Sequence, residues 1–140
     1  MSEEIVLIDR SDGVMTITLK RPKARNAVNR ALAEGVSAAL DELDSNDDIR
    51  VAILTGAGGT FCSGMDLKAF LRGENIGPFM EFVKEGAQKP LIGAIEGFAL
   101  AGGLELALSC DLLVASEGAK MGIPEVGVGL FASAGGVLRL

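Results

Sequence analysis

The sequence contains no histidine, no tryptophan and no tyrosine among its 140 residues. The absence of histidine excludes Ser–His–Asp and Cys–His nucleophilic mechanisms, and it excludes metal sites that depend on imidazole ligands. Acid–base chemistry in this chain must therefore use other groups. Carboxylates are the obvious candidates, because the chain has 19 aspartates and glutamates and a positioned carboxyl group can act as acid or base.

Cysteine is also scarce. Cys62 and Cys110 are the only two, and they have no metal-ligand spacing, so we expect no metal site. A disulfide is conceivable, but nothing in the sequence suggests export, and reduced, buried thiols are the favoured interpretation.

Positive charge is low, and long uninterrupted apolar runs are missing. The net charge of −6 argues against a nucleic-acid partner, although a local basic patch could still hold a phosphate. Residues 91–115 are strongly apolar, but Glu96, Glu105 and Asp111 interrupt them. An acidic residue at the centre of a bilayer costs about 2.5–3.5 kcal/mol. We therefore expect no membrane segment, and the acidic start of the chain predicts a cytoplasmic protein without a targeting signal.

Glycine and apolar residues are abundant. Of the 19 glycines, 17 lie after residue 55, and 49% of the residues are hydrophobic. Glycine mixed with apolar residues indicates tight turns and close backbone contacts rather than a flexible linker. The length suits one domain over residues 1–140.

Strand and helix patterns alternate along the chain. An Asp-Gly pair at residues 12–13 predicts a hairpin between its flanking β-rich runs, and Asn29 is placed to cap a long amphipathic helix. This alternation predicts an α/β fold with a largely parallel sheet. The expected strands are 5–8, 14–19, 51–55, 91–95 and 111–115, and the expected helices are 29–43, 66–71, 78–88 and 104–109.

The carboxyl end has the pattern of an unfinished helix. Residues 135–140 begin with two glycines and continue with apolar residues and one arginine, and the chain stops there. No capping residue follows. We therefore expect a core domain that is incomplete at its carboxyl end.

Two glutamates are the strongest catalytic candidates. Glu105 follows a glycine-rich turn, and Glu125 follows Ile123-Pro124. Two carboxylates that hold one water can perform acid–base chemistry without imidazole. The alternatives are that Glu105 is a buried structural acid and that Glu125 is a first-turn helix carboxylate.

Two glycine-containing loops complete this candidate site. Residues 61–68 and 97–105 each run from a strand into a helix, so backbone N–H groups near Met65 and Gly102 could face a ligand. Two such amides can form an oxyanion hole that stabilises an enolate. The alternative is that both loops are only tight turns of the fold.

Taken together, these motifs resemble the crotonase family, the enoyl-CoA hydratase/isomerase group. The resemblance covers essentially the whole chain, and it implies a crotonase-like (ClpP/crotonase) α/β fold of repeated ββα units, truncated before the family's carboxyl-terminal helices. The motifs lie, in the family's order and spacing, at residues 21–27, 61–68, 97–111, 123–125 and 135–136.

The resemblance also assigns roles. It implies that the Met65 and Gly102 amides polarise the thioester carbonyl of an acyl-CoA, where Met65 replaces a common alanine. For three of the CoA-binding candidates, Lys23, Arg25 and Lys68, solvated surface cations are an equally good interpretation. The full set that the resemblance places along CoA is Lys23, Ala24, Arg25, Ser63, Met65, Asp66, Leu67 and Lys68.

The function implied is that of an enoyl-CoA hydratase, which adds water across a trans-2-enoyl-CoA to give a 3-hydroxyacyl-CoA. Glu105 would act mainly as the base toward water and Glu125 as the proton donor to the α-carbon. An enoyl-CoA isomerase, another acyl-CoA enzyme of the family and a non-catalytic fragment that keeps the fold are the alternatives. No cofactor is expected beyond the CoA of the substrate, and the full-length form would be a homotrimer or hexamer.

Overall fold

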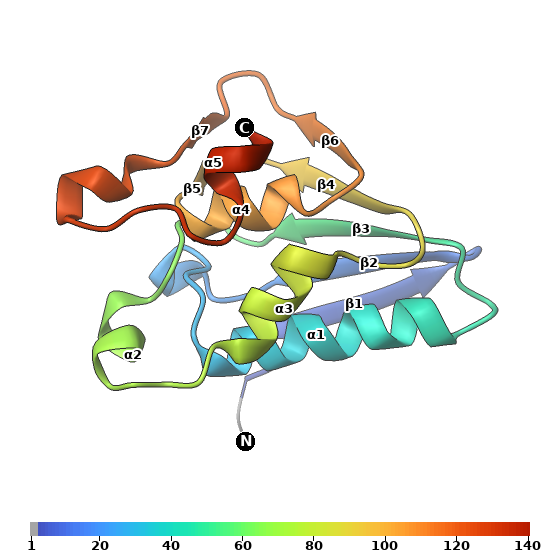
Figure 1. The fold of residues 1–140 in the computed structure, drawn as a ribbon. Helices are drawn as coiled ribbons and strands as arrows, with labels where there is room; N and C mark the ends of the chain where they lie inside the picture. The colour runs from blue at the N-terminus through green and yellow to red at the C-terminus, as the bar shows by residue number, and fades with distance from the viewer. Residues whose placement is uncertain (1–2) are drawn as a thin grey trace.

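The main sheet runs through the whole molecule. The computed structural model describes residues 3–140. Its five-stranded sheet has the order β1-β2-β3-β4-β6 (Figure 1). The strands are β1 (Val6–Ser11), β2 (Val14–Leu19), β3 (Val51–Gly56), β4 (Leu91–Ile95) and β6 (Leu112–Ala115).

The sheet is antiparallel only at its first pair. β1 and β2 form the predicted hairpin, and Asp12 and Gly13 at its turn have φ values of 51° and 79°. Two consecutive positive φ values are typical of the tight turns that match strand twist. β2, β3, β4 and β6 pair in parallel, which confirms the predicted largely parallel sheet.

A second, smaller sheet lies beside the first. It pairs β5 (Phe98–Leu100) with β7 (Lys120–Gly122) in parallel, and Cys62 forms an isolated bridge to Ala99 of β5. β4 and β5 lead into α4 (Gly102–Leu108), so the predicted ββα repeat is present. The sequence did not reveal β5 and β7, because three residues are too few to show strand periodicity.

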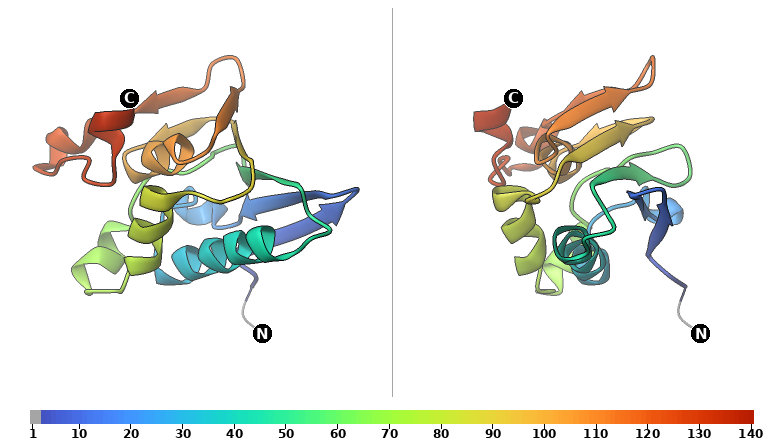
Figure 2. Two further views of the ribbon diagram at one scale, coloured as in Figure 1. Left: turned by 45° about the vertical axis from the view of Figure 1, so that its right-hand side comes forward. Right: turned by 90° about the vertical axis from the view of Figure 1, so that its right-hand side faces the viewer.

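The last repeat ends in short helices. β6 and β7 are followed by the 3₁₀ helix η2 (Pro124–Val128) and then by α5 (Gly136–Arg139). The predicted helix start near residue 135 is therefore confirmed, and α5 lies against α4 (Figure 2).

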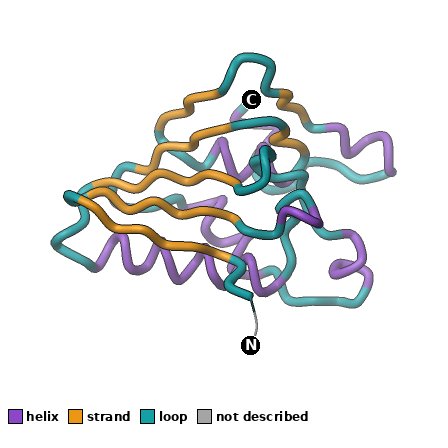
Figure 3. The backbone as a smooth tube through the Cα atoms, turned by 180° about the vertical axis from the view of Figure 1, so that it is seen from behind, coloured by secondary structure: helices purple, strands orange, loops and turns teal. Residues whose placement is uncertain are grey.

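Helices α1 and α3 pack together on one face of the main sheet. α1 (Arg30–Ser45) begins at the predicted cap, where the Asn29 side chain accepts a hydrogen bond from the N–H of Leu32 at 3.0 Å. Its buried residues recur every three or four positions, as the apolar pattern predicts. α3 (Gly77–Glu85) lies next to it, and in the view from behind both helices lie beyond the strands (Figure 3).

The predicted burial of the thiols is confirmed for Cys62, whereas Cys110 is only partly buried. Cys62 and Cys110 are free, and Cys62 is fully buried. Burial raises the pKa of both thiols to about 12, so neither forms a thiolate readily at neutral pH. Among residues 3–140, no helix combines the length and apolar character needed to cross a membrane.

The Asn26 side chain connects residues 21–26 to the loop after β3. Its side chain is fully buried, and its Oδ1 accepts a hydrogen bond from the N–H of Arg21 at 2.8 Å. Its Nδ2 donates to the carbonyls of Ala57 at 2.9 Å and Thr60 at 2.7 Å. A buried amide with all these partners is stabilising, but losing the partners would be costly. The Asn26 backbone has φ of 55°, a left-handed conformation that asparagine tolerates well.

We predict that Asn26→Asp lowers the free energy of unfolding by about 3 kcal/mol or more, because a carboxylate would face two carbonyl oxygens in a buried site. Aspartate tolerates the same backbone conformation, so the change isolates the hydrogen bonds. The measurement is urea unfolding of the protein. Asn75→Asp is the matched control, since Asn75 is exposed and only accepts a hydrogen bond, from the N–H of Gly77. Equal losses for the two variants would contradict this role.

Candidate active site

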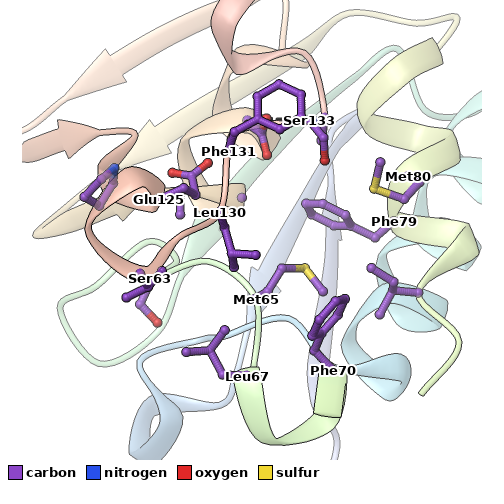
Figure 4. A pocket seen from close by; sticks show the side chains of 17 residues that line it. Ser63, Met65, Leu67, Phe70, Phe79, Met80, Glu125, Leu130, Phe131 and Ser133 are labelled. Carbon is purple, nitrogen blue, oxygen red and sulfur yellow. Dashed lines mark hydrogen bonds between the residues drawn. The ribbon is translucent and has the colours of Figure 1, made fainter. Parts of the chain in front are cut away.

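Most of the predicted site residues line one pocket of about 410 Å³. It is bounded by residues 63–70, the start of α4, helix α3, and the segment from η2 to residue 134. Figure 4 shows Phe70, Phe79 and Met80 on one side of the pocket and Glu125 on the opposite side. Its polar side chains are Ser63, Ser133, Glu105 and Glu125, and its large apolar side chains are Met65, Leu67, Phe70, Ile76, Phe79, Met80, Val128, Leu130 and Phe131.

The Met65 amide is left free by the pairing of its neighbours. Val28 donates to the carbonyl of Gly64 at 2.7 Å and accepts from the N–H of Asp66 at 2.8 Å. Met65 lies between the two residues that are hydrogen-bonded to Val28. In such a parallel bridge the middle residue points its own N–H away from the partner segment. The N–H of Met65 accordingly has no acceptor among residues 3–140.

The Gly102 amide is free for a different reason. Gly102 is the first residue of α4, and the first amides of a helix have no partner within it. Ala101, which precedes it, has φ of 53° and ψ of −126°, a conformation that costs a non-glycine residue about 1–3 kcal/mol. This strained residue, which the sequence did not single out, turns the chain from β5 into α4.

The two loops lie against each other at α4. A Cβ on Gly102 would lie 3.7 Å from Cγ of Met65 and 3.4 Å from Cζ of Phe79, which are ordinary contacts. A Cβ on Gly103 would lie 2.1 Å from the carbonyl oxygen of Cys62, which is impossible without movement. Gly103 is therefore the position where only glycine lets the helix approach the loop, whereas the sequence pointed to Gly102 in this turn.

Glu105 is buried on α4 and held by a distant loop. Its side chain is 4% exposed, and its Oε1 accepts hydrogen bonds from the N–H groups of Ala134 at 2.8 Å and Gly136 at 3.1 Å. A Cβ on Gly136 would lie 3.0 Å from Cγ of Glu105, so a glycine there allows the close approach. The Oε2 atom has no hydrogen-bond partner in residues 3–140, and Glu105 lines the pocket.

Glu125 lies in the first turn of η2 and faces the same pocket. Its Oε1 atom is buried, and no group in the described chain donates to it. Burial raises the pKa of Glu125, and the charge of Glu105 raises it further. Glu125 is thus a first-turn helix carboxylate, as the alternative interpretation predicts. A buried, unpartnered oxygen in a pocket is nevertheless unusual for a carboxylate with a purely structural role.

The predicted CoA-binding residues divide into two groups. Ser63, Met65 and Leu67 line the pocket. The 3₁₀ helix η1 (Pro22–Ala24) and Arg25 lie beside this loop, because the carbonyl of Arg25 accepts a hydrogen bond from the N–H of Ser63 at 3.1 Å.

The remaining predicted residues lie outside the pocket lining: Lys23, Ala24, Arg25, Asp66 and Lys68. Lys23 and Lys68 are exposed. Asp66 caps α2 (Leu67–Leu71) and pairs with Arg21. The CoA contacts of all these residues stay predictions.

Comparison with known proteins gives one consistent result. The sequence profile described as enoyl-CoA hydratase/isomerase matches residues 9–140. The chain is 41% identical over 96% of its length to a protein named probable enoyl-CoA hydratase 1, peroxisomal, of Arabidopsis thaliana. It superimposes on the crystal structure of enoyl-CoA hydratase EchA1 from Mycobacterium marinum with a TM-score of 0.93, 51% identity and 99% of the chain covered.

A second solved structure is more similar in sequence. It is that of a probable enoyl-CoA hydratase/isomerase from Mycobacterium abscessus, with 57% identity, a TM-score of 0.91 and 99% of the chain covered. The chain spans about half the length of these proteins, with 53% of the Arabidopsis protein and 56% of each crystallised chain covered.

The contact at Gly103 predicts unequal effects of two neighbouring alanine substitutions. Gly103→Ala should lower the free energy of unfolding by about 3 kcal/mol, because the new Cβ collides with a backbone carbonyl. Gly102→Ala should change it by less than about 1 kcal/mol, since its Cβ has room. Urea unfolding of both variants measures the difference. Equal destabilisation would show that the close approach at Gly103 does not exist.

The raised pKa of Glu125 predicts a pH-dependent stability difference. A carboxyl whose pKa is raised by folding binds its proton more tightly in the native state, so stability falls as pH rises through that pKa. Glu125→Gln removes this loss, and its stability relative to the parent protein should therefore increase from acidic to alkaline pH. Melting temperatures at several pH values measure the trend. Glu117→Gln, at an exposed site, is the control, and its melting temperature relative to the parent should change less with pH. A melting-temperature difference for Glu125→Gln that stays constant with pH would contradict the raised pKa of Glu125.

Proposed function

Since the chain belongs to the enoyl-CoA hydratase/isomerase family, we propose that the protein carrying it is an enoyl-CoA hydratase. It would add water across the trans-2 double bond of an enoyl-CoA and form a 3-hydroxyacyl-CoA. The observation that carries this proposal is that two glutamates and two unbonded amides border one largely apolar pocket.

The amides would act on the thioester. The free N–H groups of Met65 and Gly102 come from adjacent loops, and together they can donate to one carbonyl oxygen. Donors that are fixed in advance stabilise the negative charge that develops on this oxygen, and one such donor contributes about 3–4 kcal/mol. The lining of the pocket is mostly apolar, and a hydrogen bond to a developing charge is stronger in such surroundings than in bulk water.

The glutamates would divide the proton transfers. Glu105, whose Oε1 is held by two backbone donors, has Oε2 available to accept a proton from water as the water oxygen bonds to C3. Glu125, whose raised pKa favours the protonated form, would give its proton to C2. The sum of the two transfers is the addition of one water molecule, and the product leaves Glu105 protonated and Glu125 ionised until a proton passes back.

An isomerase is the second candidate within the family, and it would move a proton between carbons without adding water. Two carboxylates at one pocket favour hydration, because one group can activate water while the other supplies a proton. Cytoplasmic location, a homotrimeric or hexameric assembly and the CoA contacts of Lys23, Ala24, Arg25, Asp66 and Lys68 are also part of the proposal. No cofactor other than the CoA of the substrate is proposed.

We predict that Glu105→Gln and Glu125→Gln each lower the hydration rate of crotonyl-CoA by about 10²–10⁴-fold, since each removes one acid–base group. The measurement is the loss of the conjugated enoyl-thioester absorbance by the full natural protein that carries this chain. Glu117→Gln, an exposed glutamate outside the pocket, should retain the parent rate. Conversion of a 3-enoyl-CoA without net hydration would favour the isomerase, and parent-like hydration by either pocket variant would overturn the assignment.

A further inference from the structure

Arg21 forms a half-buried ion pair with Asp66, the residue that follows Met65. Its Nη2 lies 3.0 Å from Oδ2 of Asp66, and the two side chains are only 19% and 18% exposed. Its Nη1 donates to the carbonyl of Ala27. An arginine that binds two acceptors with its planar group fixes both direction and distance, which lysine cannot do.

Asp66 uses its two oxygens for different tasks. Oδ1 accepts hydrogen bonds from the N–H groups of Lys68 at 3.1 Å and Ala69 at 3.2 Å, and it thereby caps α2. Oδ2 binds Arg21. The pKa of Asp66 is lowered, first by the hydrogen bond from Ala69 and then by that from Arg21, so this carboxylate stays charged.

These contacts fix the peptide on both sides of Met65. The preceding carbonyl, that of Gly64, and the following N–H, that of Asp66, are both bonded to Val28. The Asp66 side chain adds a third attachment, to Arg21, whose own N–H is bonded to the buried Asn26. The direction of the Met65 N–H therefore depends on this set of hydrogen bonds, and the ion pair of Arg21 with Asp66 is part of it.

We propose that Arg21 is a positioning residue for the reaction, and that it acts through Asp66 to hold the Met65 N–H in the direction needed by the thioester oxygen. This proposal rests on the proposed function. Arg21 lies outside the pocket lining, so its effect on catalysis would come from orientation and not from contact with substrate. A misplacement of about 1 Å can cost about 10²-fold in rate.

The test uses the full natural protein carrying this chain and the variant Arg21→Met. We expect kcat for crotonyl-CoA to fall about 10- to 100-fold with little change in KM, because an oxyanion hole acts more strongly in the transition state. The kcat of Arg21→Lys should lie between that of Arg21→Met and that of the parent protein. The matched control is Arg10→Met, which removes an ion pair with Glu42 whose side chains are 49% and 32% exposed, and which should leave kcat unchanged.

A spectroscopic measurement separates orientation from simple loss of stability. Bound 2,4-hexadienoyl-CoA absorbs at longer wavelength when its carbonyl is polarised, and this red shift should be smaller in Arg21→Met than in the parent. Asp66→Asn provides a second variant in case Arg21→Met does not fold. It keeps a side-chain oxygen that can cap α2 but removes the charge that pairs with Arg21, and it should also reduce both kcat and the red shift.

The outcomes distinguish this inference from the function on which it rests. Reduced kcat and a reduced red shift in a cooperatively folded variant support the positioning role. Parent-like kcat and red shift in the folded variants would overturn it, whatever their melting temperatures, and would leave the hydratase proposal intact. A parent protein that neither hydrates crotonyl-CoA nor shifts the probe would overturn both.

Discussion

The buried side-chain amide of Asn26 makes the hydrogen bonds on which the arrangement of the pocket depends. It joins the loop after β3, through the carbonyls of Ala57 and Thr60, to the backbone of Arg21. Arg21 then reaches Asp66, beside the free Met65 amide. Since the amide is shielded from water, no solvent could replace its partners without cost. Segments far apart in sequence are thereby held as one rigid support for the site.

Close backbone contacts impose the second constraint. Gly103 brings α4 against the carbonyl of Cys62, and this contact sets the Gly102 amide beside the Met65 loop. Gly136 allows a later loop to reach the Glu105 carboxylate. These glycines have no chemical role of their own. Because they have no Cβ, they permit close approaches that a larger residue would prevent unless the neighbouring atoms moved.

The two glutamates differ because the fold gives them different partners. Backbone donors hold Glu105, whereas Glu125 has a buried oxygen without a donor and a raised pKa. Groups of the same chemical type acquire opposite roles in acid–base catalysis when their environments differ in this way. The sequence predicted this pair and the motifs that border it, but the burial and the missing donor belong to the folded chain.

The sequence by itself determined the local features of this protein: the Asp-Gly hairpin, the Asn29 cap, the alternation of strands and helices, and the motifs that identify the family. Each depends on residues within a few positions of one another, so local rules suffice. Only the tertiary structure decided the strands β5 and β7, the partners of Glu105 some 29 and 31 residues away, and the pairing of Arg21 with Asp66 over 45 residues. Such contacts depend on how the whole core packs, because no short stretch of sequence specifies which distant group will lie opposite another.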